Sequence, residues 1–150
     1  MRAVIQRVTE ASVVINDNQV AKIGKGILLL LGIESEDTQE DITWLSVKIA
    51  KMRIFSDENG LMNTSLIDVS GDVIVVSQFT LFASTKKGNR PGFTRSAKSD
   101  VAIPLYQSFV KQLELELGRT IQTGEFGADM KVSLINDGPV TITIDTKSKE

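Results

Sequence analysis

The chain has 150 residues, of which 41% are hydrophobic and 24% charged, and its net charge at pH 7 is −2. This composition is typical of a soluble globular protein, and the length predicts one domain over residues 1–150. No apolar run approaches the roughly 18 residues of a membrane span, and the first residues, MRAVIQRVTEAS, lack the pattern of a signal peptide. We therefore expect a cytoplasmic protein.

The sequence contains no cysteine and no histidine. This excludes disulfides, zinc fingers, thiol nucleophiles, Ser-His-Asp triads and histidine-ligated metals. Catalysis would have to use carboxylates, hydroxyls, Lys or Arg, backbone amides, or a group on the substrate. The sequence offers neither an evident carboxylate pair nor a phosphate-binding glycine loop, so we predict no metal and no cofactor.

Alternating apolar residues bounded by turn residues predict most of the strands. In chain order they are residues 2–15 (a strand pair or one long bent strand), 19–23, 27–33, 73–76 with a continuation through Ser-Gln-Phe-Thr-Leu, 119–123, 130–136 and 140–145. Residues 61–69 are expected to be irregular or edge structure.

Apolar residues at helical spacing predict two amphipathic helices. The first is expected from a cap at Asp37 or Thr38 to about Met52, and the second from a cap at Ser99 or Asp100 to Gly118. Strands mixed with two such helices predict an α/β domain with a mixed sheet or partial barrel.

A loop is expected over roughly residues 84–98, and it carries a run of cations with no acid among them. These are Lys86, Lys87, Arg90, Arg95 and Lys98. Two interpretations are open: a solvated basic loop, or a local phosphate-binding patch on an otherwise acidic protein.

Two further segments place polar or turn-forming residues beside strands. Ser77, Gln78 and Thr80 interrupt a strand that should be buried on both faces, where an unpaired polar group costs about 1–3 kcal/mol. Either these groups bond nearby backbone, or the strand end opens into a pocket. Proline does not belong in a central strand, so Gly138–Pro139 within NDGP predicts a four-residue hairpin loop or a functional element.

Four motifs together resemble the D-aminoacyl-tRNA deacylase (D-tyrosyl-tRNA deacylase) family. They are MRAVIQRV (1–8), SQFTL (77–81), KGNRPGF (87–93) and NDGPVT (136–141), and they occur in order along essentially the whole chain. Each motif alone is weak, but four in sequence are specific. Members of this family are homodimeric cytoplasmic hydrolases, which cleave the ester between a D-amino acid and the ribose at the 3′ end of tRNA.

The resemblance implies a catalytic segment made of Ser77, Gln78, Phe79 and Thr80. Backbone N–H groups near Gln78, Phe79 and Thr80 would hold the oxyanion, while the free 2′-hydroxyl of the ribose assists the attack of water. A direct role of the Thr80 hydroxyl is the alternative. Lys86, Lys87 and Arg90 would contact the acceptor phosphates of the tRNA.

The resemblance also implies a substrate-binding set, namely Leu81, Gly138, Pro139, Asn136 and Arg7. The Gly138–Pro139 bond would be cis, and the dipeptide would enter the partner subunit's pocket and block an L side chain. Glycyl-tRNA would then be accepted, because glycine has no side chain to exclude. Arg7 is expected to pair with the Gly-Pro carbonyls.

Two positions depart from the family pattern. Asp137 stands where other members often have Ser, and Gly92 where some members have a bulkier residue. Two other functions remain open: a non-catalytic RNA-binding module that uses the basic loop, and a relative tuned to glycyl- or L-alanyl-tRNA.

Overall fold

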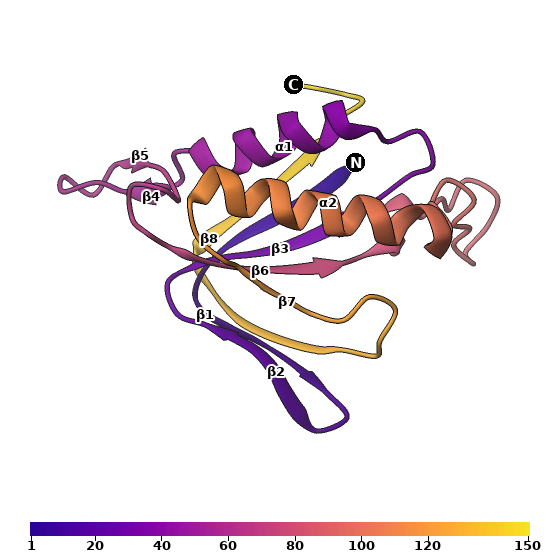
Figure 1. The fold of residues 1–150 in the computed structure, drawn as a ribbon, viewed down its shortest axis with the longest axis horizontal. Coiled ribbons are helices and arrows are strands. Elements are labelled where there is room, and N and C mark those ends of the chain that lie inside the picture. Colours follow the sequence, from indigo (N-terminus) through magenta and orange to yellow (C-terminus); the bar gives the residue numbers. More distant parts are fainter.

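The computed structural model describes residues 1–150 and confirms an α/β fold with a mixed sheet and two long helices (Figure 1). The strands are β1 (Arg2–Ile15), β2 (Asn18–Ile23), β3 (Gly26–Gly32), β4 (Phe55–Ser56), β5 (Met62–Thr64), β6 (Asp72–Ser77), β7 (Gln122–Thr123) and β8 (Lys131–Asp145). The helices are α1 (Gln39–Lys51), the short 3-10 turn η1 (Phe79–Phe82) and α2 (Ser99–Leu117). Residues 2–15 therefore form one long strand rather than a strand pair.

The main sheet is organised around β1. Its strand order is β2-β1-β3-β6-β7, and β8 also pairs with β1. Along β1, antiparallel pairing with β3 covers Arg2–Val8 and antiparallel pairing with β2 covers Ala11–Ile15. The β3–β6 and β6–β7 pairs are parallel. Parallel neighbours need a long crossover, and α1 and α2 provide the two crossovers.

The sheet curls until β7 approaches β2. The side chain of Gln122 accepts a hydrogen bond from the Lys22 N–H at 2.7 Å and donates one to the Lys22 carbonyl at 2.6 Å. This side chain pairs with the strand edge as a neighbouring strand would, so the partial barrel is nearly closed. Its interior is apolar and includes Val8, Val13, Leu28, Ile74 and Val76.

A second core lies between the sheet and the helices, which lie side by side on one face (Figure 1). Ile42 and Leu45 of α1 and Phe109 of α2 pack there against Leu29 and Leu31 of β3. Leu28, between these positions, faces the barrel core instead. The run ILLLL is continuously apolar because both of its faces are buried.

The ends of the helices agree in part with the expected caps. Thr38 caps α1 and forms a capping box with Asp41, and Gly118 ends α2 with a left-handed φ of 68°. The expected cap at Ser99 or Asp100 is wrong, because α2 begins at Ser99 and its N-cap is Lys98, which makes no side-chain cap hydrogen bond. The carbonyl of Lys98 instead accepts the N–H groups of Val101 and Ala102. Neither α1 nor α2 has the combination of length and apolarity that a membrane crossing requires.

The expected continuation of the strand through SQFTL is wrong. β6 ends at Ser77, and residues 79–82 form the 3-10 turn η1. The partner strand β3 ends at Gly32, and η1 packs directly on this glycine: a Cβ there would lie 3.1 Å from the Leu81 Cβ. The chain turns because its pairing partner ends.

The predicted hairpin at NDGP is also wrong. Residues 131–145 form one strand, β8, which pairs with β1 on both sides of this segment. The register shifts between Gln6 and Val8 and again between Val8 and Glu10, so NDGP is an irregular stretch within a strand. The side chain of Asn136 stabilises it by bonding both the N–H and the carbonyl of Val140, at 2.7 and 3.2 Å.

Candidate active site

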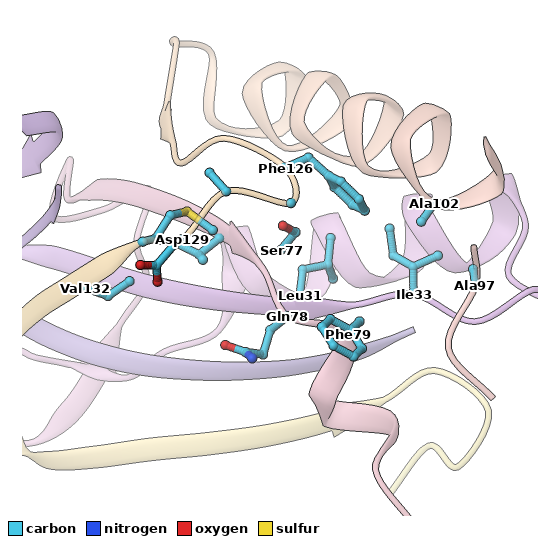
Figure 2. A pocket seen from close by; sticks show the side chains of 14 residues that line it. Leu31, Ile33, Ser77, Gln78, Phe79, Ala97, Ala102, Phe126, Asp129 and Val132 are labelled. Carbon is cyan, nitrogen blue, oxygen red and sulfur yellow. The ribbon is translucent and has the colours of Figure 1, made fainter. Parts of the chain in front are cut away.

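A cavity of about 310 Å³ opens where the parallel strands β3 and β6 end (Figure 2). In this view Leu31 and Ser77 lie between Phe126 above and Phe79 below. The carboxyl ends of parallel strands are where α/β folds bind ligands, because the connections diverge there. Ser77, Gln78 and Phe79 line this cavity, whereas Thr80 and Leu81 lie outside its lining.

The turn η1 begins at the lining of the cavity with Phe79. The first N–H groups of a helical turn have no acceptor within the turn, which here concerns Phe79 and Thr80. The carbonyl of Gln78 is already used, since it accepts the N–H of Leu81 at 3.2 Å. The Gln78 side-chain amide donates to the hydroxyl of Thr80. The segment therefore offers backbone donors, while the Thr80 hydroxyl is already a hydrogen-bond acceptor.

The loop over residues 84–98 packs against η1. The ring of Phe93 meets the ring of Phe79 edge to face with centroids 5.0 Å apart. Ser96 donates its hydroxyl to the Phe79 carbonyl at 2.8 Å. The ring of Phe79 is nevertheless 56% exposed, so it is available to a ligand at the mouth of the cavity.

Residues Phe126–Met130, FGADM, form a wall of the cavity that the sequence reasoning missed. All five line it together with Val132 of β8. This segment connects β7 to β8, and Gly124 before it leaves room for the side chain of Met130. The sequence does carry one indication of this wall. Exposed loops are usually polar, whereas this connection contains a phenylalanine and a methionine.

Arg7, on β1, anchors the NDGP segment of β8. Its guanidinium is almost buried and donates to the Ile54 carbonyl at 2.6 Å and to the Asp137 carbonyl at 2.9 Å. The Asp137 carboxylate adds an ion pair at 3.3 Å. The expected bonds to the Gly138 and Pro139 carbonyls are not formed; Arg7 holds the residue before them.

The Gly138–Pro139 peptide bond is cis, in agreement with the family resemblance. Both residues are exposed, and neither lines the cavity of its own chain. Gly138 has a φ of 139°, and a Cβ there would lie 2.8 Å from Val140 Cγ2 and 3.1 Å from Arg7 Nη2. Only glycine fits this position without displacing its neighbours.

The basic loop divides into free and engaged cations. Lys86, Lys87 and Arg90 are exposed and form no ion pair. Arg95 instead pairs with Glu34 at 3.0 Å, and its guanidinium lies over the Phe82 ring at 5.2 Å. Lys98, at the end of the loop, is also exposed and forms no ion pair. Three of the four cations available to a polyanion therefore lie in the first half of the loop.

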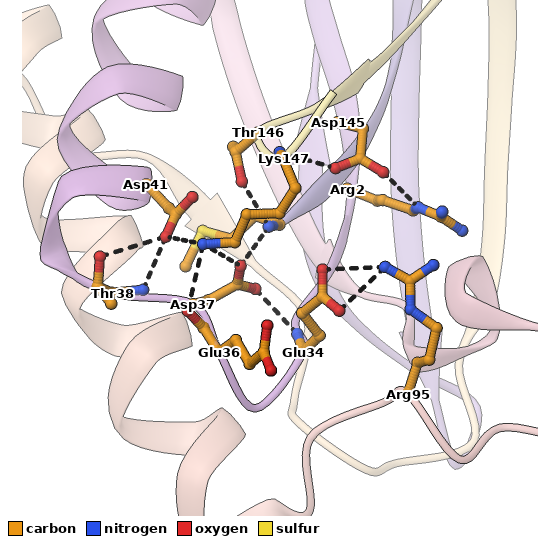
Figure 3. A network of polar contacts seen from close by, with 11 residues as sticks. Arg2, Glu34, Glu36, Asp37, Thr38, Asp41, Arg95, Asp145, Thr146 and Lys147 are labelled. Atoms are coloured by element: carbon orange, nitrogen blue, oxygen red, sulfur yellow. Dashed lines mark hydrogen bonds and ion pairs between the residues drawn. The ribbon is translucent and has the colours of Figure 1, made fainter. Parts of the chain in front are cut away.

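A polar network joins the start of β1 to the end of β8 and to the beginning of α1 (Figure 3), and Arg2 extends it to η1. Arg2 pairs with Asp145 at 2.8 Å and donates to the Leu81 carbonyl at 3.0 Å. Burial tends to raise the pKa of Asp145, but the hydrogen bond from Arg2 and that from the Lys147 amide hold it below its ordinary value. The anionic carboxylate keeps Arg2 in place against η1.

The same network contains two carboxylates with opposite pKa shifts. Burial raises the pKa of Asp37, although this carboxyl also bonds the α-amino group of Met1. Burial acts in the same direction on Asp41, but hydrogen bonds from Lys147, Thr146 and Thr38 outweigh it and lower the pKa. These groups pack between α1 and the end of β8 and do not line the cavity. The structure contains no cluster of His, Cys, Asp or Glu that could hold a metal ion.

The whole chain is similar to proteins of known family. A family model described as D-Tyr-tRNA(Tyr) deacylase matches residues 4–145. Proteins named D-aminoacyl-tRNA deacylase from Flavobacterium psychrophilum and Flavobacterium johnsoniae are 65% and 64% identical over 150 residues, covering 100% of each chain.

Two solved structures share the fold. One, named c-Myc DNA Unwinding Element Binding Protein, has a TM-score of 0.91 and 42% identity, covering 97% of this chain and 98% of that one. The other, described as a probable eukaryotic D-amino acid tRNA deacylase, has a TM-score of 0.83 at 18% identity, over 95% and 97% of the two chains. The second likeness concerns the fold alone.

Proposed function

The chain belongs to the D-Tyr-tRNA(Tyr) deacylase family, and from this premise we propose that backbone amides of η1 catalyse the reaction. The reaction itself follows from the relatives, which are named D-aminoacyl-tRNA deacylases, that is, hydrolases acting on aminoacyl-tRNA. Because the chain has no histidine and no cysteine, it has no imidazole base and no thiol nucleophile. The main supporting observation is the end of β6, where η1 begins with Phe79 at the lining of a cavity and the next amide, that of Thr80, follows directly.

In the proposed mechanism, water attacks the ester carbonyl carbon of the D-aminoacyl group. The carbonyl oxygen becomes an oxyanion, which accepts hydrogen bonds from the amides of Phe79 and Thr80. The neighbouring 2′-hydroxyl of the ribose assists the attack. Collapse of the intermediate breaks the bond to the 3′-oxygen, which takes up the proton that the water has lost and leaves as the ribose hydroxyl. One amide donor to an oxyanion is worth about 2.7–4 kcal/mol.

Phe79→Pro tests this mechanism, because proline removes one N–H and no other backbone atom. Gln78 before it has φ −143° and ψ 80°, outside the α region that a following proline disfavours. Phe79→Ala is the matched control, since it removes the ring and keeps the N–H. We expect kcat of Phe79→Pro to lie about 10²–10³-fold below that of Phe79→Ala. Equal rates would exclude the Phe79 amide as an oxyanion donor.

Thr80→Ala separates the hydroxyl from the amide at the next position. The variant keeps the N–H and loses the hydroxyl that accepts from Gln78. If the amides stabilise the oxyanion, hydrolysis of D-tyrosyl-tRNA should remain substantial. A loss of about four orders of magnitude would instead assign the hydroxyl a direct role, comparable to loss of a catalytic nucleophile.

Chiral selection is proposed to act between two copies of the chain. The Gly138–Pro139 dipeptide is exposed, held by Arg7 and Asn136, and absent from the cavity of its own chain. In a homodimer it would enter the partner subunit's cavity and exclude an L side chain, with few contacts to a D side chain. Glycyl-tRNA would be accepted for the same reason.

Gly138→Ala tests the selective role of this dipeptide. The added Cβ would displace Val140 or the Arg7 guanidinium, so the dipeptide should move. We expect L-tyrosyl-tRNA hydrolysis to rise relative to D-tyrosyl-tRNA hydrolysis. A monomer in sedimentation experiments with full D-selectivity would contradict the action between subunits.

We also propose the domain organisation, cellular location and tRNA contacts of the protein from its family. Residues 1–150 would act as one domain without a cofactor, in the cytoplasm where aminoacyl-tRNA is used. Lys86, Lys87 and Arg90 would contact the acceptor phosphates, because they are exposed and unpaired on the loop that follows η1. Incubation with D- and L-tyrosyl-tRNA is the basic assay; failure to release either amino acid would refute the enzyme.

A further inference from the structure

The orientation of an amide donor depends on what its peptide carbonyl bonds. The Thr80 N–H and the Phe79 carbonyl belong to one planar peptide unit, so fixing the oxygen fixes the direction of the N–H. A hydrogen bond that the carbonyl oxygen accepts also polarises the amide and makes its N–H a stronger donor.

The two amides of η1 are fixed in different ways. The peptide unit of the Phe79 N–H is held within the turn, because the Gln78 carbonyl accepts the N–H of Leu81 at 3.2 Å. The peptide unit of the Thr80 N–H is held by two bonds: in the 3-10 turn the Phe79 carbonyl faces the Phe82 N–H, and it also accepts the hydroxyl of Ser96 at 2.8 Å. The second amide therefore has an additional constraint, from a residue that is 17 positions away in the chain.

Ser96 is itself firmly placed. It forms a β-bridge with Glu34, and the next residue, Ala97, donates its N–H to the Ile33 carbonyl at 2.9 Å. Arg95 before it pairs with Glu34 at 3.0 Å. These contacts attach the end of the loop to the residues that follow β3, so the backbone that carries the Ser96 hydroxyl is held in place.

We propose that Ser96 is a positioning residue, whose hydroxyl orients the Phe79–Thr80 peptide unit so that the Thr80 amide can bind the oxyanion. This rests on the proposed role of the η1 amides. The loop that carries the proposed phosphate contacts thereby also orients a catalytic donor. Ser96 does not line the cavity, so we expect its contribution to affect the chemical step and to leave substrate binding unchanged.

A matched pair of variants tests this role. Ser96→Thr keeps the hydroxyl and Ser96→Val replaces it with a methyl group of the same shape, so their difference isolates the hydrogen bond. Ser96→Ala serves if the added methyl disturbs packing, and Thr94→Ala controls for changes in the exposed loop. The assay is steady-state hydrolysis of D-tyrosyl-tRNA, with thermal unfolding of every variant.

We expect Ser96→Val and Ser96→Ala to lower kcat about three- to tenfold, with KM and the unfolding temperature unchanged. Ser96→Thr should retain kcat within about twofold of the unmodified protein. Equal kcat for the Val and Thr variants, or a loss confined to KM, would overturn the role of Ser96. These outcomes require an active unmodified protein, and its failure to release D-tyrosine would instead refute the proposed function.

Discussion

Replacing Arg7 with methionine should destabilise the protein by about 2–4 kcal/mol, because the guanidinium donates hydrogen bonds to two backbone carbonyls. The Arg7 side chain is 10% exposed, and that of its partner Asp137 is 43% exposed. Nη1 donates to the Ile54 carbonyl at 2.6 Å, and Nε donates to the Asp137 carbonyl at 2.9 Å. Methionine keeps most of the apolar stem but donates no hydrogen bond.

The magnitude follows from these two carbonyls. A hydrogen bond from a charged donor contributes about 1.5–3 kcal/mol. Ile54 is 5% exposed, so its carbonyl would lose its partner with little access to water. Asp137 is partly exposed, water can replace Arg7 there, and the ion pair contributes at most about 1 kcal/mol. Losing the hydrogen bond to the Ile54 carbonyl should therefore cost its full free energy, and losing the bond to the Asp137 carbonyl should cost less.

Urea unfolding at pH 7 and one protein concentration measures the effect. Asp137→Asn is the control: it removes the ion pair, keeps the backbone carbonyl, and should cost less than about 1 kcal/mol. Arg7→Met should also weaken discrimination between D- and L-tyrosyl-tRNA, because Asp137 precedes the Gly138–Pro139 dipeptide. An unfolding free energy within about 0.5 kcal/mol of the unmodified protein would show that the guanidinium does not hold this segment.

Three further outcomes are expected. Lys86→Ala combined with Lys87→Ala should weaken tRNA binding and reduce its salt slope by about one to two, and an unchanged slope would remove these lysines from the interface. Burial raises the pKa of Tyr106, the single tyrosine, to about 12. The protonated phenol therefore stabilises the folded state below pH 10, and this contribution should be lost as the pH rises from 10 to 12. An absorbance titration that shows tyrosinate near pH 10 in the folded protein would contradict the burial of this side chain. Asp41 has a lowered folded pKa despite its burial because Lys147 bonds it, so it stabilises the fold above its ordinary pKa of 3.8 and loses this effect as the pH falls further. Asp41→Asn should therefore be less stable than the unmodified protein at pH 7, and the difference should shrink steadily as the pH falls below 3.8. A constant difference would contradict the shift.

Several elements could be predicted because their signals are local. In α1, Ile42 and Leu45 recur at helical spacing, and Thr38 forms a capping box with Asp41 in the first turn. All the residues that define this helix therefore lie close together in the sequence. The strand expected at residues 27–33 is confirmed as β3, and the two cores bury both of its faces. The absence of histidine and cysteine excluded whole classes of mechanism before any fold was known.

The candidate site could be predicted only in part. The SQFTL segment was recognised as unusual, but its shape was wrong, since η1 forms where β3 ends at Gly32 and no local signal marks that point. The wall at Phe126–Met130 was missed because its residues meet Ser77 only after α2 crosses the sheet. Arg95 looked like its basic neighbours until its pairing with Glu34 was visible.

The sequence by itself determined the periodic elements, the fold class and the chemistry that this chain lacks, because each depends on residue types and on neighbours a few positions apart. The tertiary structure decided which amides adjoin a cavity, which cations are free, and that NDGP lies within β8 rather than in a hairpin. That last difference has a physical cause. The bonds of Asn136 to Val140 and of Arg7 to Asp137 hold the irregular stretch against β1, and a bond between residues 130 positions apart leaves no local trace in a sequence.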